Sequence, residues 1–143
     1  SAPDAAWERG PQLDLQEGPE LLARGNAVLV VYSTRDSWLK EYALGQLRLR
    51  DTTANPLDPS SWTKTGPVFT GNAEVFGVGH ASFVTTRDGS EHWIVYHSKD
   101  APTPGWRRNV RMQPFDWTPS GDPAFGDAAT SAARLPLPRG ECR

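Results

Sequence analysis

The chain repeats a short apolar pattern after 64 residues, and this repeat is the strongest constraint on its fold. Residues 28–36 read VLVVYSTRD and residues 92–100 read HWIVYHSKD, so that Tyr32 aligns with Tyr96. Each run is rich in β-branched and aromatic residues and follows a turn that contains glycine, which is typical of a strand after a hairpin. The sequence therefore predicts two equivalent β units.

Further strand candidates follow in the same order in both units. Residues 42–49 and 108–115 alternate apolar and polar side chains, as a half-buried strand does, and shorter candidates lie at 66–69 and 122–125. Four strands in about 60 residues, separated by loops rich in Gly, Pro, Asp and Ser, are typical of one β-propeller blade. We therefore expect an all-β fold of two four-stranded antiparallel blades.

Two blades are too few to close a propeller, because closed rings have about 4 to 8 blades and each blade packs on two neighbours. We therefore expect the chain to be a fragment of a longer protein or to assemble with a companion chain. The expected division is the end of a preceding blade or a linker at 1–15, the penultimate blade at 16–76, and the last blade with a C-terminal tail at 77–143.

Two alternative interpretations of the strands remain open. Residues 17–24 could begin a short helix with Pro19 in its first turn, although the following Gly-Asn pair would end that helix after less than two turns. An unrelated β-sandwich would explain the same pattern if the repeat is accidental. In that case the strands at 28–36 and 92–100 would lie in one sheet.

The repeat predicts that Glu17 and His80 occupy corresponding positions. They precede the matching tyrosines of the two units by 15 and 16 residues, on the strand that would line the channel of a propeller. Corresponding inner-strand positions converge on the axis, so we expect these two ionisable side chains to be neighbours. Glycines beside them, such as Gly18 and Gly79, leave room for a ligand.

Composition excludes several classes of function. Fifteen basic and seventeen acidic residues give a net charge of −2, so no broad attraction to nucleic acid or to an anionic membrane is expected. No stretch approaches the roughly 18 apolar residues of a membrane span, and the start SAPDAAWERG lacks the layout of a signal peptide. The single cysteine, Cys142, excludes an internal disulfide and a cysteine-based zinc site.

An ordered set of motifs resembles the C-terminal portion of family 43 glycoside hydrolases, from about Trp7 to about Glu141. The motifs are EGPELL, VLVVYS, YALGQL, PLDPSSWTK, PVF, GVGHASF, HWIVYH and RMQPFDW. Members of this family are five-bladed β-propeller enzymes that hydrolyse arabinose- or xylose-containing polysaccharides with inversion. The resemblance implies a secreted hydrolase of the α-L-arabinofuranosidase type, acting on plant oligosaccharides or polysaccharides, that requires no cofactor for its chemistry.

The resemblance also implies roles for individual residues. Glu17 matches the general acid, and His80 matches a histidine that lies by a calcium or other ion on the propeller axis, often contacting it through water. Arg111 matches an arginine beside the sugar, and Trp38 lies in a loop that approaches the active-site mouth, where its ring would stack on a sugar. Without the resemblance, a solvated turn acid, a hydrogen-bonded histidine, a solvated strand edge and local packing would explain these four residues.

The family's catalytic base and its tuning acid are aspartates of earlier blades, and this chain has no counterpart of either. We therefore expect the chain alone to be inactive until N-terminal blades, from the same protein or a companion chain, complete the site. The alternative from another class is a non-catalytic carbohydrate-binding or assembly module on the propeller scaffold. His92 and His97 show no ligand pattern and are expected to be structural.

Overall fold

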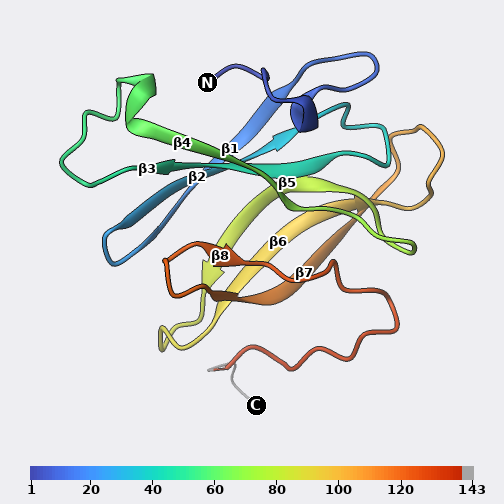
Figure 1. Cartoon of the computed structure of the whole chain (residues 1–143). Coiled ribbons are helices and arrows are strands. Elements are labelled where there is room, and N and C mark those ends of the chain that lie inside the picture. Colours follow the sequence, from blue (N-terminus) through green and yellow to red (C-terminus); the bar gives the residue numbers. More distant parts are fainter. Residues whose placement is uncertain (140–143) are drawn as a thin grey trace.

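The computed structural model describes residues 1–139, which form two four-stranded antiparallel sheets (Figure 1). The strand order follows the chain order in both sheets. The first sheet joins β1 (Gln16–Arg24), β2 (Ala27–Thr34), β3 (Ala43–Leu49) and β4 (Trp62–Phe69). The second joins β5 (Phe76–Thr85), β6 (His92–Lys99), β7 (Arg108–Trp117) and β8 (Pro123–Ala124). Short 3-10 helices are η1 (Ala6–Glu8) and η2 (Pro59–Ser61). The all-β prediction of two four-stranded blades is confirmed.

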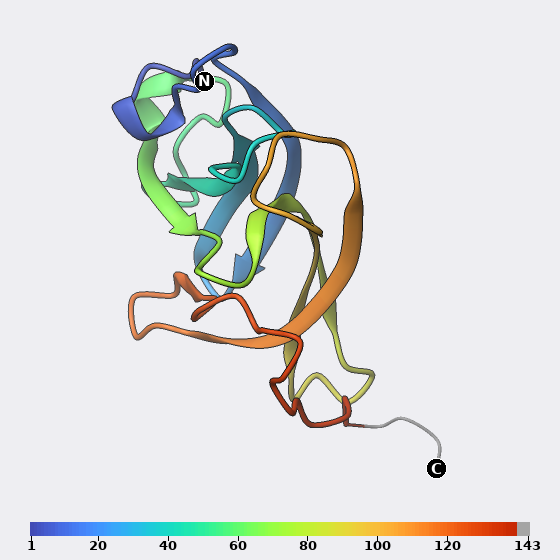
Figure 2. The ribbon, with the colours of Figure 1, turned by 90° about the vertical axis from the view of Figure 1, so that its right-hand side faces the viewer.

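The two sheets enclose one apolar core because the strands alternate. Leu29 and Val31 point from β2 into this core, and Ile94 and Tyr96 point into it from β6. Phe69 at the end of β4 packs edge-on against Tyr96, with ring centroids 4.9 Å apart. Each fully buried aliphatic side chain of this kind stabilises the fold by about 1.5–3 kcal/mol. Figure 2 shows the sheets one above the other, with the C-terminal tail beyond the second sheet.

Both alternative interpretations of the sequence are wrong. The segment that could have begun a helix is strand β1, which pairs antiparallel with β2. The two repeated runs are β2 and β6, and these lie in different sheets, so the β-sandwich interpretation fails its own criterion. The predicted border between the two repeats falls beside Phe76, the first residue of β5. The division into domains itself stays a prediction.

The second sheet has an exposed apolar face. Register places Val84, Val110 and Met112 on the side opposite the core residues Ile94 and Tyr96. The three side chains are 51%, 82% and 44% exposed. A sheet face of this composition is normally covered by another layer.

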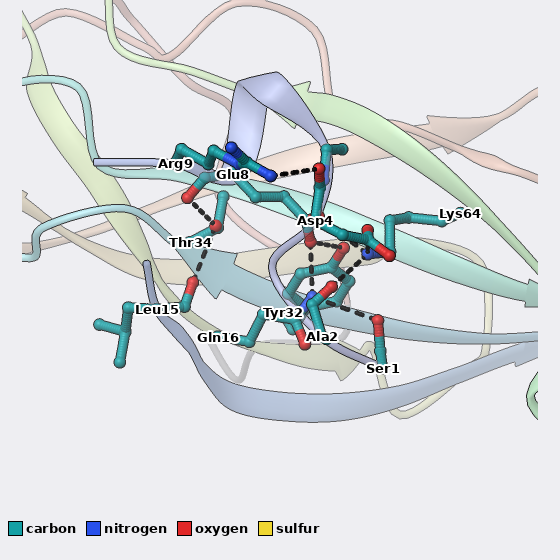
Figure 3. A network of polar contacts seen from close by, with 11 residues as sticks. Ser1, Ala2, Asp4, Glu8, Arg9, Leu15, Gln16, Tyr32, Thr34 and Lys64 are labelled. Atoms are coloured by element: carbon teal, nitrogen blue, oxygen red, sulfur yellow. Dashed lines mark hydrogen bonds and ion pairs between the residues drawn. The ribbon is translucent and has the colours of Figure 1, made fainter. Parts of the chain in front are cut away.

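One buried carboxylate attaches the N-terminal segment to the first sheet (Figure 3). Glu8 in η1 is fully buried and accepts hydrogen bonds from the Tyr32 hydroxyl at 2.7 Å and from Lys64 Nζ at 2.8 Å. It also accepts one from Gln16 Nε2 at 2.5 Å. Burial alone would raise the pKa of Glu8, but the Lys64 ammonium and the other donors hold that pKa below its usual value. The ion pair therefore links the chain start to β4.

Neither helix of residues 1–139 is long and apolar enough to cross a membrane. Cys142, for which the sequence leaves a free thiol or an external partner, lies outside the described residues.

Candidate functional site

The inner strands β1 and β5 each carry a β-bulge at the same place. In β1 the bulge lies between Glu17 and Glu20, and in β5 it follows Gly79. Gly18, with φ 55°, and His80, with φ 50°, occupy these bulges in the left-handed conformation. The Gly-Pro pair after Glu17 therefore bends an inner strand and does not end it.

The strand register corrects the predicted correspondence by one residue. Gly18, and not Glu17, is the counterpart of His80, while Glu17 corresponds to Gly79. The reason is the second hairpin, whose paired strand ends are two residues further apart in sequence than those of the first. The two inner strands nevertheless meet here, because a Cβ added to Gly18 would lie 3.2 Å from the His80 ring.

Glu17 is half-buried and is held by a tyrosine from another part of the chain. The hydroxyl of Tyr42, which precedes β3, donates a hydrogen bond to Glu17 Oε1 at 2.7 Å. The Tyr42 side chain is fully buried. Sequence analysis assigned Tyr42 only to a strand start, and no pattern in the sequence indicates this contact.

Two histidines continue the cluster around Tyr42. The ring of His97 lies parallel to that of Tyr42, with centroids 5.4 Å apart, and 6.3 Å from that of His80. Burial, assisted by the charges of Arg108 and His80, lowers the pKa of His97 to about 4, so the ring is neutral at neutral pH. His97 Nδ1 is buried and has no hydrogen-bond partner within residues 1–139. Sequence analysis treated His97 as structural, whereas its ring contacts two members of the candidate site.

His80 itself is exposed, and its backbone N–H donates to Ser33 Oγ at 2.6 Å, linking the second sheet to the first. Residues 1–139 hold no group of three or more His, Cys, Asp or Glu side chains that could bind a metal ion. An ion beside His80 would thus take most of its ligands from water or from outside this part of the chain.

Trp38 lies where two loops meet. Its ring packs against Trp106, with centroids 5.3 Å apart, and its carbonyl accepts from Gly105 N at 2.9 Å. Arg108 joins the same loops, because its guanidinium lies 4.9 Å from the Trp106 ring centroid and donates to the Ser37 carbonyl at 2.9 Å. Trp106 is 65% exposed, so the aromatic pair forms part of the surface.

Arg111 is held away from this cluster by its own hydrogen bonds. It extends from β7 and donates from Nε to Ser98 Oγ at 2.7 Å and from Nη1 to the Ala129 carbonyl at 3.0 Å. His92, the other histidine expected to be structural, packs between Phe115 and Trp117.

The acidic residues near the chain start have structural partners. Asp4 pairs with Lys64 Nζ at 2.6 Å, and the backbone of Asp14 bridges to Arg9. Asp36, fully buried, accepts from the backbone N–H groups of Gln12 and Leu13 at 3.2 and 2.9 Å. These contacts give none of the three acids a place beside Glu17.

The chain is similar to known arabinofuranosidases over almost its whole length. It is 32% identical over 149 residues to alpha-L-arabinofuranosidase 43 of Humicola insolens, which covers 98% of this chain and 29% of that protein. It is also 32% identical over 135 residues to the extracellular exo-alpha-(1->5)-L-arabinofuranosidase of Streptomyces avermitilis, covering 88% of this chain and 27% of that protein. The chain therefore spans less than a third of these curated relatives.

A solved structure agrees with the sequence matches. The crystal structure of the alpha-L-arabinofuranosidase from Lactobacillus brevis has a TM-score of 0.83 and 31% identity, over 94% of this chain and 43% of that chain. The profile of the glycosyl hydrolases family 43 matches residues 2–123. Because the profile covers most of the chain and the relatives cover nearly all of it, the chain belongs to glycoside hydrolase family 43.

Proposed function

We propose that the chain is the C-terminal part of an inverting hydrolase that releases arabinose, or xylose, from plant oligosaccharides or polysaccharides, with Glu17 as the general acid. The observation that carries this proposal is the state of the Glu17 carboxyl group. It is half-buried on an inner strand, Tyr42 holds Oε1, and Oε2 has no hydrogen-bond partner within residues 1–139. An acid arranged in this way keeps one oxygen available for a substrate.

Inversion needs a second carboxylate on the opposite face of the sugar. Glu17 would donate its proton to the glycosidic oxygen as the bond to the anomeric carbon breaks, while a base takes a proton from the attacking water. The two carboxyl groups must stand about 6.5–9.5 Å apart to admit that water. We assign the base and the tuning acid to aspartates of the propeller blades that this chain does not contain.

The exposed face of the second sheet supports completion by further blades. Val84, Val110 and Met112 would be covered if another blade packed on this face as the second sheet packs on the first. The missing blades belong in this proposal to the same protein or to a companion chain, and the isolated chain is inactive.

The remaining assignments concern substrate, ion and location. Arg111 would contact the sugar if substrate replaced its bond to Ser98 or Ala129, and His80 would contact an axial calcium, directly or through water. Family 43 hydrolysis itself needs no cofactor. Secretion is proposed from the relative of Streptomyces avermitilis, which is named extracellular.

The whole protein that contains this chain provides the test. Supplied with an α-1,5-linked arabino-oligosaccharide, it should release arabinose whose first-formed anomer, followed by proton NMR, is β. The isolated chain should release none. If the whole protein binds the oligosaccharide without turnover, the non-catalytic carbohydrate-binding module is the better description.

Replacing Trp38 by Ala should raise KM for arabino-oligosaccharides about fivefold and leave kcat within a factor of about two. The loss of one aromatic contact costs on the order of 1 kcal/mol, which corresponds to that change in KM. Steady-state kinetics of the whole protein measures both constants, and Trp38→Phe, which keeps a ring, serves as the control. Unchanged KM in Trp38→Ala would show that this ring only packs against Trp106.

A further inference from the structure

The contact between Tyr42 and Glu17 joins a buried residue to a half-buried one. Tyr42 is 0% exposed, yet its hydroxyl reaches Glu17 Oε1 at 2.7 Å from a segment 25 residues further along the chain. A buried phenol normally requires a hydrogen-bond partner, and here that partner is the residue proposed as the general acid.

The Tyr42 ring has little freedom to move. His97 lies parallel to it at 5.4 Å, and a Cβ added to Gly79 would come within 2.2 Å of Tyr42 Cε1. The ring thus occupies space that only glycine leaves open in β5. Because ring and backbone are both fixed, the position of the hydroxyl is fixed as well.

The hydroxyl also remains a donor. Burial raises the pKa of Tyr42 far above its usual value, and the Glu17 carboxylate raises it further, while the Ser33 hydroxyl and the Arg108 charge oppose the shift only in part. Tyr42 therefore keeps its proton throughout the physiological pH range, and the hydrogen bond always runs from Tyr42 to Glu17.

We propose that Tyr42 is a positioning residue that selects which oxygen of Glu17 carries the transferable proton. This inference rests on the proposed function of Glu17. In the protonated acid the carbonyl oxygen accepts hydrogen bonds and the other oxygen bears hydrogen. With Oε1 accepting from Tyr42, the proton resides on Oε2.

The proton transfer then has a defined course. The Oε2–H bond breaks as hydrogen joins the glycosidic oxygen, and the electrons of the glycosidic bond leave with that oxygen. Glu17 becomes a carboxylate, to which Tyr42 still donates. One hydrogen bond therefore holds the group in the same orientation before and after the transfer.

Tyr42→Phe in the whole protein tests the inference, because it removes the hydroxyl and keeps the ring. We expect kcat for an arabino-oligosaccharide, whose leaving group needs protonation, to fall about 10- to 100-fold with KM within about twofold. Turnover of a dinitrophenyl arabinofuranoside, whose leaving group departs without a proton, should stay within about threefold. A purely structural role would lower both rates together.

Tyr96→Phe is a matched control. Tyr96 is also buried, and its hydroxyl donates to Gln113 Oε1 at 2.8 Å, remote in the fold from Glu17. This variant should show a comparable fall in melting temperature without dependence on the leaving group. Gly79→Ala supplies a second test, because it keeps the Tyr42 hydroxyl but displaces its ring, and the same split between the two substrates is expected.

Glu17→Gln, assayed in parallel, separates this inference from the proposed function. If Glu17→Gln loses oligosaccharide turnover but Tyr42→Phe and Gly79→Ala do not, Tyr42 has no positioning role and the proposed function stands. Equal losses on both substrates in the Tyr42 and Gly79 variants also overturn the inference. If Glu17→Gln retains full activity, the proposed function itself is wrong.

Discussion

Glu17→Gln in the whole protein should lower kcat for an arabino-oligosaccharide about 10²- to 10⁴-fold, the usual contribution of general acid catalysis. The amide keeps the size of the side chain and can still accept from the Tyr42 hydroxyl, but it has no proton to donate. Hydrolysis of a dinitrophenyl arabinofuranoside should fall far less. Rates with the two substrates, measured on the same preparation, give the ratio that identifies an acid.

Glu20→Gln is the control for this experiment. Glu20 lies on the same strand beyond the bulge and is exposed. Its substitution should leave both rates within about twofold of the wild type. Equal losses in the Glu17 and Glu20 variants would indicate a general electrostatic effect, and the general acid would have to be sought elsewhere.

Glu8→Gln should cause the largest loss of stability, about 3 kcal/mol in the free energy of unfolding. Glu8 is fully buried, and its carboxylate neutralises Lys64 while accepting from Tyr32. The amide removes the charge and leaves Lys64 with only the exposed partner Asp4. Chemical denaturation of the whole protein, followed by a signal from this part of the fold, measures the change.

The effect of Glu8 should depend on pH with a defined sign. The folded state lowers the pKa of Glu8 below the value of about 4.3 that a glutamate has in an unfolded chain. Its contribution to stability is therefore complete above that value and is lost as the pH falls through the folded pKa. The difference between the wild type and Glu8→Gln should thus shrink between pH 5 and about pH 3.

Asp4→Asn tests whether burial is the cause. Asp4 pairs with the same lysine, but its side chain is 74% exposed, so its loss should destabilise the protein much less. A Glu8→Gln variant as stable as Asp4→Asn, or a stability difference from wild type that does not change with pH, would contradict the role given to Glu8.

The strands were predictable because their signal is local. Alternation and β-branched residues in β2 and β6 identify two buried central strands, and the repeat then orders the others around them. The correspondence between the inner strands was one residue out because it depends on hairpin length and on the bulge at Gly18. Both are properties of the backbone that alternation does not encode.

The candidate site was predictable only where a motif carried it. Glu17 and His80 followed from short motifs, but Tyr42 and His97 did not, since their contact exists only when the two sheets pack together. Arg108 belongs to a cluster of arginines that the sequence presents as a solvated edge, whereas its guanidinium joins two loops through Ser37 and Trp106. Such roles arise from tertiary packing and leave no periodic trace.

The backbone of His80 implies a compromise between folding and function. A residue with a Cβ at φ 50° costs about 1–2 kcal/mol relative to glycine, and Gly18 avoids that cost at the corresponding position of the first sheet. Nothing in the local hydrogen bonding requires an imidazole, because the bond to Ser33 uses only the backbone N–H. Selection for stability alone would favour glycine at this position, so the imidazole is retained at a thermodynamic disadvantage, as is common at working sites.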